Sequence, residues 1–295
     1  MKKPTFADLS IFFVKYTFNT RFFLAGLSRK SKVAHKIIDK LLFEDDEIIV
    51  IPNTLNLKNK AKNNNNNKLI KSEITINKTI EKVKSTFLPT DIIKEAVRNS
   101  TYIFIMNNCI CRTSNKCEDY PHNIGCMFLG EATTQIPRHL GREVTVEEAL
   151  REIDRADEAG LSHLIGRNKI DSVWMNVKPK EDLLSICHCC PCCCLWKVIP
   201  NLEEDIGDRM EKLEGVSVET HRENCNGCKR CIDSCFVKAI SFNKETNTIE
   251  INKNKCRGCG KCVNICKKDA ISINYTQQSV DIILDRIKNL VDYTK

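Results

Sequence analysis

Several absences narrow the function of this chain before any motif is considered. No stretch approaches the roughly 20 apolar residues that span a bilayer, so no transmembrane segment is predicted. The apolar stretch at Ile11–Val14 is broken by Asp8 and Lys15 and has no small-residue cleavage site, so we expect no secretory signal. No Gly-x-Gly-x-x-Gly fingerprint occurs, which argues against direct binding of a dinucleotide.

Acidic residues are scarce only in the first part of the chain. Residues 1–100 carry 19 Lys and Arg against 10 Asp and Glu, whereas the remaining residues carry 27 against 28. The lysines are scattered and no stacking-aromatic motif accompanies them, so no nucleic-acid partner is expected. Phe12, Phe13 and Phe18 mix with basic residues at helical spacing, which favours a packed amphipathic helix, with a membrane-surface helix as the alternative.

Cysteine, by contrast, is abundant: the 295 residues include 18. Disulfide-rich secreted scaffolds are much shorter, so these cysteines indicate ligands or reactive thiols in a reducing, cytoplasmic compartment. The pattern C-x2-C-x2-C-x3-C occurs twice, at an offset of 31 residues, and Ala-Ile-Ser-x-Asn follows each copy. This is the ligand pattern of two [4Fe–4S] cubanes, and the internal duplication strengthens it.

A zinc site and a phosphate-binding loop are the two alternative interpretations of the repeat. Paired C-x2-C elements also form zinc sites, but three closely spaced ligands plus one remote ligand fit a cubane better than two separate four-cysteine zinc sites. Arg257–Lys261 lacks the G-x4-G-K-[ST] spacing of a phosphate loop. Gly227, Gly258 and Gly260 lie between ligands, where a missing Cβ permits positive φ and lets backbone N–H groups approach the cluster.

The tail resembles the two-cluster bacterial ferredoxins, and this resemblance implies how the ligands are divided. One [4Fe–4S] cluster would be held by Cys225, Cys228, Cys231 and Cys266. The other would be held by Cys235, Cys256, Cys259 and Cys262, so that the fourth cysteine of each motif serves the other cluster. Phe236 and Lys267 stand where that family usually has proline.

A second set of ten cysteines lies in the middle of the chain: Cys109, Cys111, Cys117, Cys126, Cys187, Cys189, Cys190, Cys192, Cys193 and Cys194. Free thiols at this density are open to oxidation, so a further metal centre is predicted here. Zinc, an atypical iron–sulfur cluster and a dithiol redox site all remain open. His122 and His188 are candidate additional ligands, and Arg112 places a cation beside the thiols.

From about Leu88 onward the chain resembles an uncharacterised family of anaerobe 4Fe–4S ferredoxin-type proteins. The motifs are C-x-C-R at Cys109–Arg112, the segments 126–130 and 163–169, and the cysteine-rich run 186–196. His188 stands where Asn is expected. This resemblance implies the cysteine-rich centre and the two clusters but supplies no reaction.

The expected architecture is α+β, with a cysteine-rich α/β domain followed by a ferredoxin-like domain. The predicted divisions are 1–57 (basic and helical), 58–71 (Asn/Lys-rich linker), 72–215 (cysteine-rich), 216–275 (ferredoxin-like) and 276–295 (closing helix). Within them, helices are predicted at 32–43, 88–100, 145–158 and 278–293, and strands at 47–51, 101–106, 172–177 and 183–186.

Electron transfer is the leading functional hypothesis, because cubanes exchange single electrons without a substrate pocket. A redox protein of unknown identity would then supply the electrons. The alternative is an oxidoreductase subunit whose cysteine-rich centre reduces an unknown substrate with electrons from the cubanes. A metal-storage or cluster-assembly protein and a redox-gated nucleic-acid binder are weaker alternatives.

Overall fold

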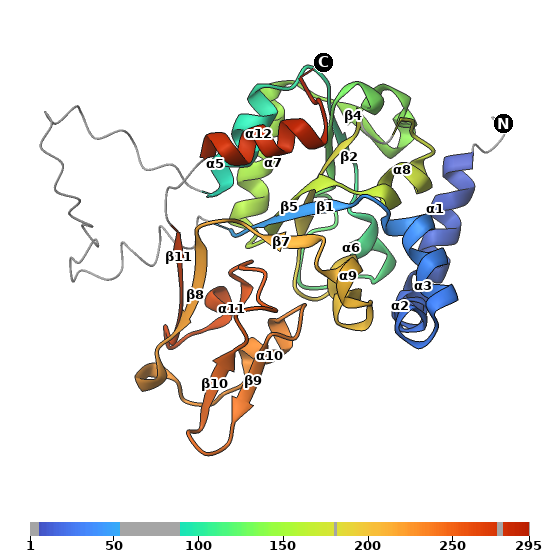
Figure 1. Ribbon diagram of the computed structural model, residues 1–295. Coiled ribbons are helices and arrows are strands. Elements are labelled where there is room, and N and C mark those ends of the chain that lie inside the picture. The colour runs from blue at the N-terminus through green and yellow to red at the C-terminus, as the bar shows by residue number, and fades with distance from the viewer. Residues whose placement is uncertain (1–5, 54–88, 180–181, 276–279, 295) are drawn as a thin grey trace, which may run out of the picture.

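The computed structural model describes residues 6–53, 89–179, 182–275 and 280–294. The predicted linker at 58–71, and with it the predicted boundary at residue 57, lies outside the described residues. The fold is mixed α/β, with a seven-stranded sheet and a C-terminal ferredoxin unit (Figure 1), as the sequence predicts.

The large sheet has the order β4-β2-β3-β6-β5-β1-β7. Its strands are β1 (Glu47–Ile51), β2 (Ile103–Met106), β3 (Met127–Leu129), β4 (Gly141–Glu143), β5 (Ser162–Arg167), β6 (Leu184–Cys189) and β7 (Met210–Lys212). All neighbours are antiparallel except β1 and β7, which are parallel. The strand predicted at 47–51 is β1, which lies between β5 and the edge strand β7, so it belongs to this sheet although it precedes the segment expected to form the cysteine-rich domain.

Three helices cover one face of the sheet, namely α5 (Pro89–Arg98), α7 (Val146–Glu158) and α12 (Val280–Leu290) (Figure 1). Buried side chains such as Ile93, Ile153 and Ile287 form one core with the strands. α7, predicted at 145–158, begins with a capping box: Thr145 Oγ1 accepts from Glu148 N, and the Glu148 carboxylate accepts from Thr145 N.

The opposite face carries α1 (Phe6–Thr17), α2 (Arg21–Lys30), α3 (Lys32–Ile38) with the π-helical turn Asp39–Phe43, α8 (Lys169–Met175), the 3-10 helix Leu195–Asn201 and α9 (Glu204–Gly207). Ala25, Phe43 and Trp196 pack in one cluster there, and Trp174 packs in a second. Residues of both clusters line one cavity between the sheet and these helices.

The N-terminal helices α1–α3 pack through only part of their apolar surface. Ile11 and Val14 contact the core beside α8, and Ile38 and Leu42 contact the cluster around Trp196. Other apolar side chains of these helices are exposed: Leu9, Phe12, Phe13, Tyr16, Phe23, Leu24, Val33, Ile37 and Leu41. No helix in the described ranges is long and apolar enough to cross a membrane.

The prediction of a strand at 172–177 is wrong, because residues 172–175 belong to α8 and residues 176–177 follow its end. Trp174 Nε1 donates to Asp171 Oδ1 one helical turn earlier, at 3.1 Å. Asn176 adopts the left-handed conformation that ends the helix. These local contacts outweigh the β propensity of Val173 and Trp174, which suggested a strand.

The ferredoxin unit follows β7 and repeats itself in structure as it does in sequence. It comprises β8 (Val216–Thr220), α10 (Arg230–Ser234), β9 (Ile240–Asn243), β10 (Thr248–Ile251), α11 (Lys261–Ile265) and β11 (Ile271–Tyr275). Both short helices begin after a residue with left-handed φ, Lys229 in the first copy and Gly260 in the second. β9 pairs with β10, and β11 pairs with β8.

Candidate iron–sulfur and metal sites

The eight cysteines of the ferredoxin unit line two separate cavities. The first is lined by Cys225, Cys228, Cys231 and Cys266. The second is lined by Cys235, Cys256, Cys259 and Cys262. In each cavity, three cysteines come from one copy of the motif and the fourth from the other copy. This is the grouping that the resemblance to two-cluster ferredoxins implies; which residues bind iron stays a prediction.

Backbone N–H groups point at the sulfur atoms of these cavities. Ala239 N donates to Cys235 Sγ at 3.2 Å and Ala270 N to Cys266 Sγ at 3.3 Å, at equivalent positions of the two copies. Gly258 N donates to Cys256 Sγ at 3.5 Å. Hydrogen bonds of this kind stabilise thiolates and tune the potential of a bound cluster.

The glycines predicted to have positive φ adopt it: φ is 68° at Gly227, 64° at Gly258 and 75° at Gly260. A Cβ on Gly258 would come within 2.8 Å of Lys212 Cγ and Val216 Cγ1. The ligand loop therefore packs closely against the start of the ferredoxin unit and against β7.

Burial raises the pKa of Cys231 to about 11 and that of Cys259 to about 11. Both thiols are therefore protonated at neutral pH until a metal displaces the proton. The residues present fit [4Fe–4S] clusters, because each cavity combines four thiols, and Cys235, Cys256 and Cys266 also accept backbone N–H groups.

The ten central cysteines fall into two groups. Four of them, Cys117, Cys190, Cys192 and Cys193, have sulfur atoms that all lie within 4.8 Å of one another. Cys117 Sγ and Cys192 Sγ are 3.5 Å apart. Two thiolates on one tetrahedral zinc ion lie about 3.8 Å apart, given a Zn–S distance of about 2.3 Å. This group, called the thiol tetrad below, therefore has the dimensions of a mononuclear site.

The tetrad depends on one tight turn and one distant loop. Cys190, Cys192 and Cys193 follow the end of β6, where Pro191 reverses the chain. Cys193 N donates to Cys190 Sγ at 3.3 Å, which favours a thiolate at Cys190. A hydrogen bond from Cys192 lowers the pKa of Cys190 to about 6.

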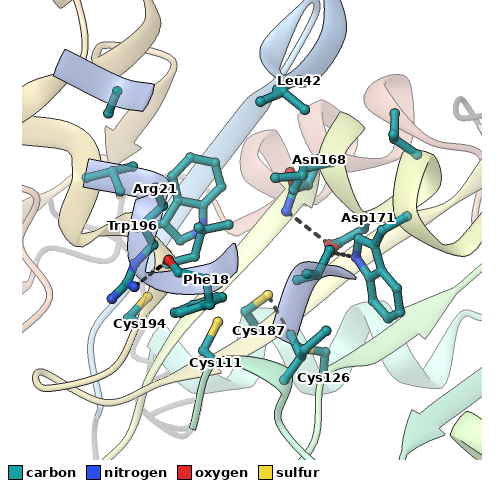
Figure 2. A pocket seen from close by; sticks show the side chains of 18 of the residues that line it. Phe18, Arg21, Leu42, Cys111, Cys126, Asn168, Asp171, Cys187, Cys194 and Trp196 are labelled. Carbon is teal, nitrogen blue, oxygen red and sulfur yellow. Dashed lines mark hydrogen bonds between the residues drawn. The ribbon is translucent and has the colours of Figure 1, made fainter. Parts of the chain in front are cut away.

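The other six central cysteines line a cavity of about 360 Å³ between the sheet and the N-terminal helices, which Cys190 of the tetrad also lines (Figure 2). They are Cys109, Cys111, Cys126, Cys187, Cys189 and Cys194, called the six-thiol group below. In Figure 2, Cys194 lies beside Arg21 and Cys111 lies below Phe18, while Cys187 and Cys126 lie further along the cavity and are joined by a dashed line. Cys187 and Cys189 both lie in β6, and because they are two residues apart they share one face of this strand.

Neither candidate histidine lies in the tetrad. His122 Nε2 contacts Cys117 O at 2.7 Å, so it holds the backbone of a tetrad residue. His188 Nδ1 lies 2.8 Å from His163 Nδ1, and His163 Nε2 lies 2.9 Å from Asp157 Oδ1. By strand alternation, His188 occupies the sheet face opposite to Cys187 and Cys189.

Two buried cations stand beside the central thiols. Arg112 is fully buried and donates to the carbonyl oxygens of His188, at 2.8 Å, and Ile124. Lys261, from the ferredoxin unit, is 5% exposed and donates from Nζ to Cys190 O at 3.0 Å. The sequence singled out Arg112 but not Lys261, whose only signal is its place between two ligand cysteines.

A C-terminal ferredoxin unit and a cysteine-rich sheet domain define an iron–sulfur protein. Comparison with family models agrees: residues 224–277 match the 4Fe–4S dicluster domain, which implies two [4Fe–4S] clusters. No curated protein and no solved structure matches the chain. The ferredoxin-type tail predicted from the cysteine repeat is thereby confirmed.

Proposed function

We propose that this protein is a one-electron carrier that passes electrons through two [4Fe–4S] clusters to a metal-containing cysteine-rich domain. The observation that carries the proposal is the dicluster domain at 224–277 together with the two four-cysteine cavities. A bound [4Fe–4S] cluster supplies reversible one-electron chemistry. The protein contributes the thiolates, the backbone N–H groups that tune the potential and the apolar walls that exclude water.

We propose further that the thiol tetrad binds one metal ion in tetrahedral geometry. All-thiolate tetrahedral sites suit zinc or a single iron. Cys117 and the loop 190–193 come from distant parts of the chain, so a metal there would tie the loop after α6 (Ile110–Ser114) to the end of β6. The metal ion would have a structural role, since protein thiolates fill all four of its tetrahedral positions.

The electron donor is proposed to be a separate redox protein in a reducing cytoplasm, because no dinucleotide motif occurs in the sequence. An oxidoreductase subunit is the second candidate. The cavity of about 360 Å³ beside the six-thiol group favours it, because a relay alone needs no such space.

The test is a metal and sulfide count on anaerobically purified protein and on two Cys-to-Ser variants. Cys225→Ser should lose the electron paramagnetic resonance (EPR) signal of one reduced cluster and keep the other. Cys192→Ser should lose the tetrad metal and leave both cluster signals intact. Fewer than about eight irons per chain, with no [4Fe–4S] signal after dithionite reduction, would refute the carrier function.

A further inference from the structure

The sulfur atoms of the six-thiol group form an extended chain of contacts. Cys194 Sγ lies 3.2 Å from Cys189 Sγ, and Cys187 Sγ lies 3.8 Å from Cys126 Sγ. Electrostatic interactions link Cys187 to Cys189, and Cys109 to both Cys111 and Cys126, so the series of neighbouring thiols continues through the group. Among the described residues, the thiol tetrad is the one group of three or more possible ligands whose ligand atoms all lie within 4.8 Å. An extended chain fits several metal ions rather than one.

Charge gives a second and independent argument. Arg112 and Lys261 are both buried, and within the described ranges neither forms an ion pair with a carboxylate. A buried cation costs several kcal/mol unless an anion compensates it. The charges that act on these two side chains most strongly, after the cost of burial, are those of cysteines. The pocket is therefore built to hold negative charge on sulfur.

The carboxylate that lines the cavity is engaged elsewhere. Asp171 accepts from Asn168 Nδ2 at 2.9 Å, Ser185 Oγ at 2.8 Å and Trp174 Nε1 at 3.1 Å. The remaining walls are largely apolar and include Phe18 and Trp196 (Figure 2). The low polarity of these walls strengthens the attraction between charged sulfur atoms and the buried cations.

We propose that this cavity holds a third iron–sulfur cluster, polynuclear and anionic, bound by thiolates of the six-thiol group. This site goes beyond the two clusters of the proposed function, but its supply of electrons rests on them. In the transfer step, the cluster at the second ferredoxin cavity loses one electron, from [4Fe–4S]⁺ to [4Fe–4S]²⁺, and the third cluster gains it. An external redox protein then returns the cluster at the second ferredoxin cavity to its reduced state by giving it one electron.

The ferredoxin unit contacts the third site directly. Lys261 lines the second ferredoxin cavity and donates to Cys190 O, one residue beyond Cys189. Ser162 Oγ of β5 donates to Cys259 O at 2.8 Å. Cys189 and Cys194 belong to the same apolar cluster that Cys235, Cys256 and Cys259 pack against. These contacts place the second cavity, rather than the first, beside the third cluster.

The experiment compares iron, sulfide and EPR signals in the full-length protein with those of Cys126→Ser/Cys187→Ser and Cys192→Ser, all purified anaerobically. We expect about ten irons or more in the wild-type chain, since the smallest polynuclear cluster adds two irons to eight. The Cys126→Ser/Cys187→Ser variant should fall to about eight and keep both ferredoxin signals, which shows that the chain is folded. The Cys192→Ser variant should keep the iron of the third site.

Reduction potentials of the second and third clusters show whether Lys261 acts through its charge or only through its packing. Lys261→Met should shift the potentials of the second and third clusters to more negative values, because a positive charge beside each is removed. Arg230→Met is the matched control, since Arg230 occupies the same position in the first copy but is exposed, and should leave the third potential unchanged.

The third cluster would be refuted if wild-type protein contained about eight irons, gave both ferredoxin signals, and held zinc or free thiols in the six-thiol group. The carrier function would remain intact in that case. Equal iron contents in wild type and Cys126→Ser/Cys187→Ser would overturn it as well. Loss of the ferredoxin signals from the wild type would instead refute the carrier function.

Discussion

Arg112 offers the sharpest test of the charge balance at the centre of the molecule. Its guanidinium donates to two backbone carbonyls, those of His188 and Ile124, and its Nε has no hydrogen-bond partner among the described residues. Arg112→Met keeps most of the volume but removes the charge and both hydrogen bonds. The consequence depends on whether an anionic cluster is present.

With the cluster bound, the variant loses two hydrogen bonds from a charged donor, each contributing about 1.5–3 kcal/mol, and leaves two buried carbonyls unpaired. The loss is therefore about 3–6 kcal/mol in the cluster-loaded state. With the cluster removed, wild-type Arg112 is a poorly compensated buried cation that costs several kcal/mol, and replacing it by Met relieves that cost. In the stripped state, the two effects offset each other.

Unfolding rates in urea, followed by far-UV circular dichroism, measure both states. Unfolding rates are measured instead of equilibrium free energies of unfolding, because a protein that loses its clusters does not unfold reversibly. We expect Arg112→Met to unfold at least about a hundredfold faster than wild type when loaded, and less than about tenfold faster when stripped. Arg98→Met removes an exposed pair with Glu95 and should change either rate little. The same ratio of rates in both states would refute the reasoning.

Three further predictions concern parts of the fold that position the sites. Gly258→Ala should abolish the EPR signal of the second cluster and spare the first, because a Cβ there meets Lys212 and Val216 at positive φ; Gly26→Ala, which meets nothing within 4 Å, is the control. Thr145→Ala breaks the capping box, which contributes about 1 kcal/mol, and should unfold in urea up to about fivefold faster than wild type; an unchanged unfolding rate would contradict this. Burial raises the pKa of Asp171, so the folded state holds this proton more tightly than the unfolded chain does. The contribution of Asp171 to stability then falls as pH rises above about 4, so the unfolding rate of wild type in urea should rise relative to that of Asp171→Asn between pH 4 and 7.

The ferredoxin unit was predictable because its information is local. Ligand spacing, the positions of Gly227 and Gly258 and the 31-residue repeat all lie within short stretches of sequence. The helix that follows Thr145 and the strand at 47–51 were predictable for the same reason, since each depends on neighbouring residues. The strand predicted at 172–177 failed because a side-chain hydrogen bond within α8 is invisible to alternation of apolar residues.

The division of the ten central cysteines could not be predicted from the sequence. Cys190 and Cys189 are adjacent and both line the cavity, yet only Cys190 belongs to the tetrad. That separation depends on the turn at Pro191 and on Cys117, which lies 73 residues before Cys190 in the sequence. Lys261 was missed for a similar reason, because its contact with Cys190 exists only once the ferredoxin unit packs on the sheet.

The placement of the ferredoxin unit between β7 and α12 has a kinetic consequence. The chain leaves the sheet at Lys212, forms the unit, and returns in α12, whose Ile283 and Ile287 pack in the same core as Ile49 of β1. A module anchored at both ends cannot drift away as one on a single tether can, so its effective concentration at the sheet does not depend on dilution. Electron exchange between the unit and the sheet domain is thus expected to be first order, with a half-life that is the same in dilute and concentrated protein. Only the step that brings electrons from outside should depend on concentration.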